Sequence, residues 1–290
     1  MRLRWDWLAP MITVPYVPTL GPVHPDAVSE DVFADVIAVA GSGRFVPYDK
    51  ARLWGGRKRE HVLAEAVVHT PEQTLIPTLT STRRGRAVRT YGYGDLDHGL
   101  AAEVTAKLRA DLGAESGQVT WFDGVTETVE LTGSRVLLND LRTQQNSSND
   151  HGRVSVLSDA PDEVAATFAD FAAQSSEPGM RYLSDRRAAG RDDGPVLVVV
   201  GEGRVVGAIG PLRTLADPRG VVALAPQYFA VLPEYRGRGH GRALWRAAMA
   251  WGRRRGAAYQ LLQAEVGSPA EGLYLAEGLT TLGHVHTTPT

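Results

Sequence analysis

The sequence has no cysteine among its 290 residues. Disulfide bonds, thiolate metal ligands and a cysteine nucleophile are therefore excluded. Neither charge is in large excess, because 31 basic residues against 33 acidic ones give a formal net charge of only −2. This balance offers no electrostatic case for nucleic acid or an anionic membrane as a partner. Lysine is scarce, and the preference for arginine suggests a bacterial protein from a GC-rich genome.

Long apolar runs are also absent. No window approaches the roughly 20 apolar residues that a membrane span requires. The first seven residues, MRLRWDW, carry charges where a secretory signal needs a continuous apolar core. We therefore predict a cytoplasmic protein without a membrane partner. The hydrophobic content of 43% is that of a globular chain with a real core.

The length suits two domains of ordinary size. A polar run at 143–150, TQQNSSND, contains no apolar residue and is typical of a linker. We place an N-terminal α+β domain at 1–145 and a second domain at 152–290.

The second domain alternates strands and helices, which predicts an α/β fold with a mixed sheet. The expected elements are a strand at 154–158, a helix near 161–174, a hairpin of 195–200 and 205–209, a strand at 221–232, a helix at 239–255, a strand at 260–266, a helix at 268–277 and a strand at 280–286.

The first domain is less regular. Its expected elements are a helix at 26–40, strands at 73–80 and 86–93, a helix at 98–112, and strands at 118–122 and 126–131. The order strand, helix, strand over 86–122 repeats part of the second domain. This leaves two alternatives: a degenerate copy of the second domain, or an unrelated α+β domain that shapes an acceptor pocket or an oligomer contact.

The stretch 228–245, YFAVLPEYRGRGHGRALW, joins a hydrophobic strand to an amphipathic helix through a glycine-rich, basic elbow. Helix starts have unpaired N–H groups and a positive dipole end, so they favour anions. Glycines at 237, 239 and 241 would let the backbone approach a phosphate closely. The spacing matches neither the dinucleotide fingerprint nor the P-loop.

The elbow resembles the acetyl-CoA signature R/Q-x-x-G-x-G/A of the GNAT acyltransferase family. Val231-Leu-Pro233 also resembles the strand end that precedes this signature, and the resemblance covers 153–288. It implies an acyl-CoA co-substrate whose pyrophosphate meets the backbone of the elbow. The implied contacts are Arg236, Gly237, Arg238, Gly239, His240, Gly241 and Arg242.

In this family the strand before the elbow splays from its neighbour at a bulge, and the pantetheine arm pairs with its exposed edge. By motif position this edge is Phe229, Ala230 and Val231, whose side chains would otherwise serve simply as core packing.

The segment 270–279, AEGLYLAEGL, resembles the family segment whose tyrosine lies near the sulfur of coenzyme A. Tyr274 is therefore the candidate proton donor to the leaving thiolate, with a packed helix aromatic as the alternative. Ser268 is either a coenzyme A contact or the cap of the short helix.

A general base is harder to find, because the strand before the elbow carries no acid. Glu265 could accept the proton directly or through water, although a glutamate at a strand end is more often solvated. Gln227 and Tyr228 could position a water molecule or the acceptor. His284 and His286 share a strand face, but no third ligand has suggestive spacing, so we expect no metal.

In the N-terminal repeat, Asp95 and Asp97 lie where the elbow would be. Two carboxylates at a helix start would repel a pyrophosphate.

These observations predict an N-acetyltransferase that moves an acetyl group from acetyl-CoA to the amine of a small molecule in a ternary complex. The alternatives are a larger acyl group, an oxygen acceptor, or a non-catalytic acyl-CoA sensor or scaffold. A homodimer is compatible with the sequence.

Overall fold

The computed structural model describes residues 3–82, 85–125, 133–143, 154–191 and 193–290. The expected strand at 126–131 and nearly all of the expected linker at 143–150 lie outside these residues. The chain forms two compact units. Unit 1 comprises residues 1–138, 217–219 and 261–290, and unit 2 comprises residues 139–216 and 220–260.

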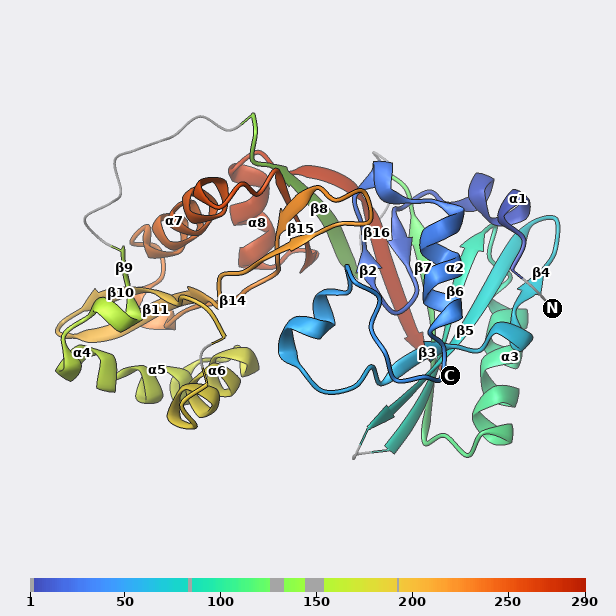
Figure 1. Cartoon of the computed structure of the whole chain (residues 1–290), viewed down its shortest axis with the longest axis horizontal. Helices are drawn as coiled ribbons and strands as arrows, with labels where there is room; N and C mark the ends of the chain where they lie inside the picture. The colour runs from blue at the N-terminus through green and yellow to red at the C-terminus, as the bar shows by residue number, and fades with distance from the viewer. Residues whose placement is uncertain (1–2, 83–84, 126–132, 144–153, 192) are drawn as a thin grey trace. The chain divides into compact units, whose positions relative to one another are not determined.

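Most of the helices and strands lie where the sequence pattern predicted them. Figure 1 shows these elements. The helices are α1 (Trp5–Leu8), α2 (Glu30–Ala38), α3 (His98–Asp111), α4 (Asp162–Ala166), α5 (Phe168–Gln174), α6 (Pro178–Ala188), α7 (His240–Arg254) and α8 (Pro269–Ala276).

The strands of the first 140 residues are β1 (Tyr16–Val17), β2 (Gly21–Pro22), β3 (Glu60–Val62), β4 (Val68–His69), β5 (Gln73–Thr82), β6 (Gly85–Gly94), β7 (Ser116–Asp123) and β8 (Ser134–Asp140). The later strands are β9 (Val154–Val156), β10 (Leu197–Gly201), β11 (Arg204–Gly210), β12 (Thr214–Ala216), β13 (Val222–Leu224), β14 (Tyr228–Val231), β15 (Tyr259–Glu265) and β16 (Thr280–Pro289).

Unit 2 is built on a four-stranded sheet in the order β9-β10-β11-β14. The helices α4, α5 and α6 cover one face of this sheet, and α7 covers the other (Figure 1). The apolar face of α7 explains its position, because Ala243, Leu244 and Ala248 are buried at helical spacing. The arginines near its C-terminus suit the negative end of the helix dipole.

The expected strand at 221–232 is in fact two strands, β13 and β14, that belong to different sheets. Between them lie Ala225, Pro226 and Gln227. Proline has no N–H to donate and forces the preceding residue out of the helical region, so it interrupts a sheet ladder. β13 instead pairs with β12 and, in parallel, with the start of β15.

The expected helix at 161–174 is also divided, into α4 and α5. Thr167 lies at the break, where its hydroxyl donates to the carbonyl of Val164 and accepts from the backbone N–H of Val205. Threonine that bonds the preceding turn in this way bends helices.

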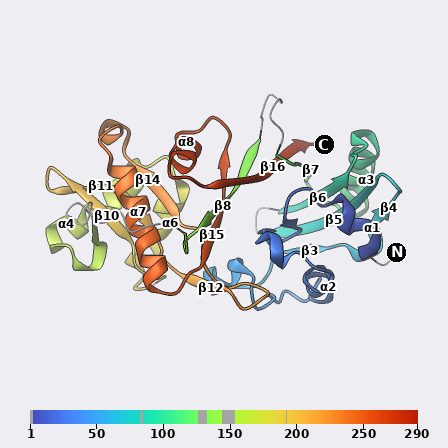
Figure 2. The same cartoon turned by 90° about the horizontal axis from the view of Figure 1, so that it is seen from above.

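Unit 1 contains a mixed sheet in the order β15-β8-β16-β7-β6-β5-β3, with β4 also pairing with β5. β6 and β7 are parallel and are connected by α3, which packs against both strands (Figure 2). The buried core includes Phe33, Tyr91, Tyr93 and Phe122.

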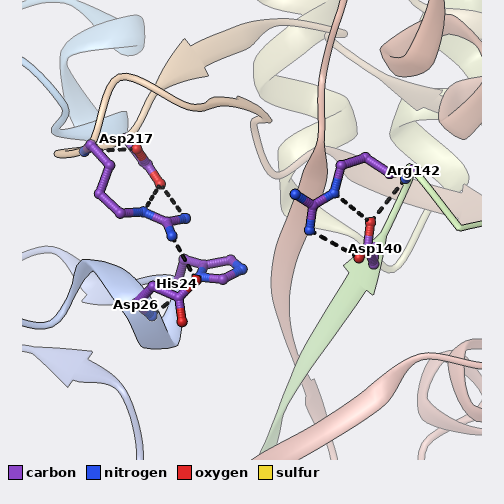
Figure 3. Close-up of polar contacts among 6 residues, drawn as sticks. His24, Asp26, Asp140, Arg142 and Asp217 are labelled. Carbon is purple, nitrogen blue, oxygen red and sulfur yellow. Dashed lines mark hydrogen bonds and ion pairs between the residues drawn. The ribbon is translucent and has the colours of Figure 1, made fainter.

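The C-terminal segment 261–290 belongs to unit 1 because β16 is an interior strand of that sheet. It pairs with β7 on one side and with β8 on the other, both antiparallel. The short segment 217–219 belongs there too, and its Arg219 makes an ion pair with Asp26 as well as one with Asp217 inside the segment (Figure 3). The compact units therefore do not follow the two sequence halves.

Within the described part of the chain, no helix is both long enough and apolar enough to cross a membrane.

Candidate acyl-CoA site

The helix α7 begins at an exposed elbow. Gly239 is its N-cap residue, with φ +83° and ψ −2°, and no side chain caps the first turn. Gly237 also has a positive φ of +75°. A Cβ atom at either glycine would meet nothing within 4 Å. The start of a long helix thus faces open space without a capping side chain, which is the geometry that an anion needs.

Two arginines of the elbow bond to the backbone beside it. Arg236 donates from Nε to the carbonyl of Val231 at 3.1 Å, and Arg238 donates to the carbonyl of Glu234 at 3.0 Å. Arg238 also lies 5.1 Å from the ring centroid of the buried Tyr235. These contacts hold two exposed positive charges next to the first turn of α7.

The strand β14 leads into this elbow along the outer edge of the four-stranded sheet. Its inner edge pairs with β11, with Ala230 opposite Ala208 and no register shift. This pair therefore runs without a bulge, and β14 lies at the edge of its sheet. The expected splay at a bulge stays a prediction.

The side chains of β14 alternate between the two faces of the sheet. Phe229 and Val231 face α7, because a Cβ atom on Gly241 would lie 3.5 Å from Phe229 and 3.9 Å from Val231. Their side chains thus pack under the first turn of α7, which leaves the backbone edge of the strand for ligand contacts.

One hydrogen bond joins the chain ahead of β14 to the start of β15. Gln260, which is buried, donates from Nε2 to Oε1 of Gln227 at 2.7 Å. Gln227 in turn donates to the carbonyl of Ala225. The two strands therefore begin close together, although they belong to different sheets.

Tyr228 faces α6 on the other side of β14. A Cβ atom on Gly179 would lie 2.0 Å from the Tyr228 ring, so this tyrosine fits directly onto the helix backbone. Tyr182 meets it edge to face, with ring centroids 6.3 Å apart. Burial first, then the nearby Tyr182 and Glu177, raise the pKa of Tyr228, so its phenol is protonated at neutral pH.

The remaining predicted residues belong to unit 1. Tyr274 is buried in α8, and Glu265 is exposed at the end of β15. Ser268 caps α8, since its Oγ accepts from the N–H of Glu271 at 3.2 Å. Glu271 also accepts from Arg135 at 2.5 Å and from the N–H of Gly267 at 2.6 Å. The loop that carries these residues is thus fixed by an ion pair.

The N-terminal repeat has the same element order but a different site. Asp97 caps α3 by accepting from the N–H of Leu100 at 3.0 Å, so a carboxylate occupies the N-cap position of this helix. β6 and β7 pair directly from Ala87 to Gly92. β14 and β15, in contrast, belong to different sheets, so the two pairs of strands differ.

The two histidines of β16 are buried in unit 1. Neither ring nitrogen of His284 hydrogen-bonds to a described residue, and burial lowers the pKa of this imidazole. Nε2 of His286 lies 3.0 Å from Oδ2 of Asp123. Among the described residues, no group of three histidine or carboxylate side chains is placed to hold a metal ion.

A model of the acetyltransferase (GNAT) family matches residues 162–278. These residues form a GNAT domain. The segment contains the elbow, β14, α6 and Tyr274, and the family match extends from unit 2 into unit 1. A search of curated proteins finds no match.

Several solved structures resemble the chain at low identity. A glucosamine N-acetyltransferase region in a fungal multi-domain β-N-acetylglucosaminidase is 13% identical, with a TM-score of 0.50 over 90% of this chain and 37% of that one. A GCN5-related N-acetyltransferase of Sphaerobacter thermophilus is 16% identical, with a TM-score of 0.46 over 75% of this chain and 80% of that one. A tandem GNAT protein from the clavulanic acid pathway is 13% identical, with a TM-score of 0.48 over 90% of this chain and 96% of that one.

The first of these likenesses extends over both halves of the chain and supports a shared fold. Together with the order β6-α3-β7, it is consistent with a degenerate GNAT unit in the N-terminal half.

One element of the GNAT domain was missed by sequence reasoning. α6 carries mostly polar residues, and only Gly179, Met180 and Leu183 are buried. The start of this helix could have been recognised in the sequence, because Pro178 takes the first helical position. Glu177 before it is the N-cap residue, and its side chain accepts from the N–H of Gly179. Without α6, the sequence could not show that Tyr228 and Tyr182 meet.

Proposed function

We propose that this protein transfers an acetyl group from acetyl-CoA to an amine of a small molecule, by direct attack in a ternary complex. The family match supports acyl transfer in general. The observation that carries the proposal is the uncapped, exposed start of α7 beside the outer edge of β14.

The cofactor-binding residues would act mainly through their backbone. The first-turn N–H groups from Gly239 to Arg242 would donate to the pyrophosphate, and Arg236 and Arg238 would add positive charge. The outer edge of Phe229, Ala230 and Val231 would hydrogen-bond to the amides of the pantetheine arm. A backbone N–H of this strand would also polarise the thioester carbonyl.

Tyr274 would give a proton to the departing thiolate. A phenol, with a pKa of about 10, is a slightly weaker acid than a thiol, with a pKa of about 8.5, so it would stabilise the thiolate by a hydrogen bond and transfer its proton at a small cost in free energy. The resemblance of its segment to the family motif supports this role. The burial of Tyr274 suits a group that must act away from bulk water.

The acceptor would lie against Tyr228 and Tyr182. Glu177 adds negative charge near Tyr228. Asp193 is instead ion-paired with Arg186 and Arg213, and the Arg186 guanidinium lies 5.5 Å from the Tyr182 ring centroid. The Tyr228 ring and Glu177 would therefore be the groups that favour a cationic amine. The amine must lose a proton before attack, and Glu265 or a water held by Gln227 would accept it.

Two other functions remain as alternatives. The same fold would transfer a larger acyl group or use an oxygen acceptor. The absence of a carboxylate on the described strand β14 favours a non-catalytic acyl-CoA sensor as the second candidate. A cytoplasmic location and a homodimer remain predictions.

A thiol-release assay with acetyl-CoA and a panel of amines tests the proposal. The wild type is compared with Tyr274→Phe and Gly239→Glu, and acetyl-CoA binding is measured by calorimetry in parallel. We expect release by the wild type, a lower kcat with retained binding in Tyr274→Phe, and lost binding in Gly239→Glu. Binding without release for every acceptor would favour the sensor, and an absence of binding would refute both functions.

A further inference from the structure

Unit 1 contains a cavity of about 450 Å³. Its walls come from the C-terminal part of α2, the turn that follows it, and the segment that leads into β3. None of its lining residues is among those assigned to acyl transfer. Cavities of this size hold small organic molecules.

The floor of the cavity is apolar. Leu20, Val36 and Val46 line it, and each is at most 7% exposed. All three belong to the hydrophobic core of unit 1. A ligand with an apolar group would bind more tightly here, because burying that group against the floor of the cavity lowers the free energy.

Both carboxylates that line the cavity already have protein partners. Asp49 accepts from Nζ of Lys58 at 2.5 Å and from the N–H of Ala51 at 2.8 Å. Glu60 accepts from the hydroxyls of Thr78, at 2.9 Å, and Tyr91, at 3.0 Å. The charge of Asp49 is therefore compensated by Lys58, whereas Glu60 keeps its charge but forms no ion pair with the arginines of the cavity among the described residues.

Arg44, Arg57 and Arg59 line the same cavity and are exposed. Across the described part of the chain, none of the three forms an ion pair with a carboxylate. The one side-chain hydrogen bond of Arg57 goes to the carbonyl of Ser42, at a long 3.4 Å. Guanidinium groups are suited to bidentate contacts with carboxylate or phosphate.

Lys58 also lines the cavity, and its positive charge is paired with the negative charge of Asp49. Its ammonium donates to Asp49 and to the carbonyl of Thr19, both at 2.5 Å, and its side chain is only 11% exposed. An ammonium has three N–H groups, so one remains for a ligand.

We propose that this cavity binds a small organic anion, with its apolar part on the floor of Leu20, Val36 and Val46 and its carboxylate or phosphate between Arg57 and Arg59. The site is separate from the acyl-transfer residues, and it does not depend on the proposed function.

The probe is 8-anilinonaphthalene-1-sulfonate, whose fluorescence rises when its apolar rings leave water while its sulfonate remains charged. It is titrated into the wild type, into Arg57→Gln/Arg59→Gln, and into Ala40→Trp, which adds bulk to the half-exposed wall of the cavity. Arg254→Gln, on the exposed side of α7, is the matched control. Titrations are run with and without excess acetyl-CoA, and the unfolding midpoint of each variant is recorded.

We expect binding by the wild type and Arg254→Gln, and affinity weaker by about tenfold in the double variant, as the loss of charge-assisted hydrogen bonds implies. Ala40→Trp should abolish binding without lowering the unfolding midpoint. Octanoate and octyl phosphate should displace the probe, and the preferred one identifies the anionic group.

Equal affinity in wild type and both cavity variants would overturn the proposal. Displacement by octan-1-ol as strong as that by octanoate would overturn it too, because the arginines would then play no part. Neither result depends on acetyltransferase activity.

Discussion

Gln260 donates a hydrogen bond to Gln227 at 2.7 Å and thereby joins the start of β15 to the chain ahead of β14. Replacing either glutamine with leucine should lower the free energy of unfolding by about 1 kcal/mol. A double-mutant cycle of Gln227→Leu and Gln260→Leu, measured by urea unfolding, should give a coupling energy of similar size. If the stability losses of the two single variants simply added up in the double variant, this hydrogen bond would not contribute to holding the two strands together.

Gly239 and Gly256 form a matched pair for testing the elbow. Both are exposed, have φ near +80° (+83° and +78°), and would place a Cβ atom in open space. Glutamate at either position should cost about 1–2 kcal/mol of stability, because the left-handed conformation strains a residue with a Cβ atom. Only Gly239→Glu should abolish acetyl-CoA binding in calorimetry. Equal loss in both variants would mean that strain, and not the elbow, controls affinity.

Gly179 and Gly272 are helical glycines with opposite surroundings. A Cβ atom on Gly179 would lie 2.0 Å from the Tyr228 ring, whereas one on Gly272 would meet nothing within 4 Å. Gly179→Ala should therefore destabilise the protein by about 1–3 kcal/mol through overpacking. Gly272→Ala should stabilise it by about 0.5–1 kcal/mol.

The same change at Gly179 should raise KM for the amine and leave KM for acetyl-CoA unchanged, because it displaces the proposed acceptor wall. Thermal unfolding and steady-state kinetics check the two effects separately. An unchanged KM for the amine would show that Tyr228 is not part of the acceptor site.

The ion pair between Arg135 and Glu271 should matter far more than an exposed one. The two side chains are 15% and 8% exposed, and Glu271 also holds the N–H of Gly267. Arg135→Met should cost about 3–5 kcal/mol, because it leaves a buried carboxylate without its cation. Glu234→Gln removes the exposed partner of Arg204 and should cost less than about 1 kcal/mol. Similar costs in urea unfolding would contradict this ranking.

Acid should weaken unit 1 through His284. Burial, aided by Arg135 and His286, lowers the pKa of this imidazole, while Asp123 and Glu271 oppose the shift. The unfolded chain then binds more protons than the native one, so the free energy of unfolding falls as pH drops below about 6.5.

His284→Phe should reduce this acid-dependent loss between pH 7 and pH 5, measured by urea unfolding across the range. If the pH dependence of the variant matched that of the wild type, the loss would have to come from another group.

The sequence predicted the elements whose pattern is strong. The helix over 239–255 has an apolar face and basic residues in its last turn, and the structure has α7 at His240–Arg254. The hairpin of β10 and β11 turns at Glu202 and Gly203, which both have positive φ.

The sequence failed to predict features that depend on a single residue within a regular hydrophobic pattern. Pro226 and the polar Gln227 interrupt a largely apolar run, and they divide one expected strand into β13 and β14. The meeting of Tyr228 with α6 could not be predicted, because it depends on the missing side chain of Gly179. The cavity was missed for a related reason: Arg57 and Arg59 alone give no sign of the apolar floor below them.

The position of β16 between β7 and β8 has a consequence for biosynthesis. During translation, β7 and β8 leave the ribosome long before residues 280–289 are made, so each must wait with an unpaired edge. Until β16 is made, these unpaired strand edges offer other nascent chains a place to pair, so the sheet of unit 1 is most open to aggregation during that interval.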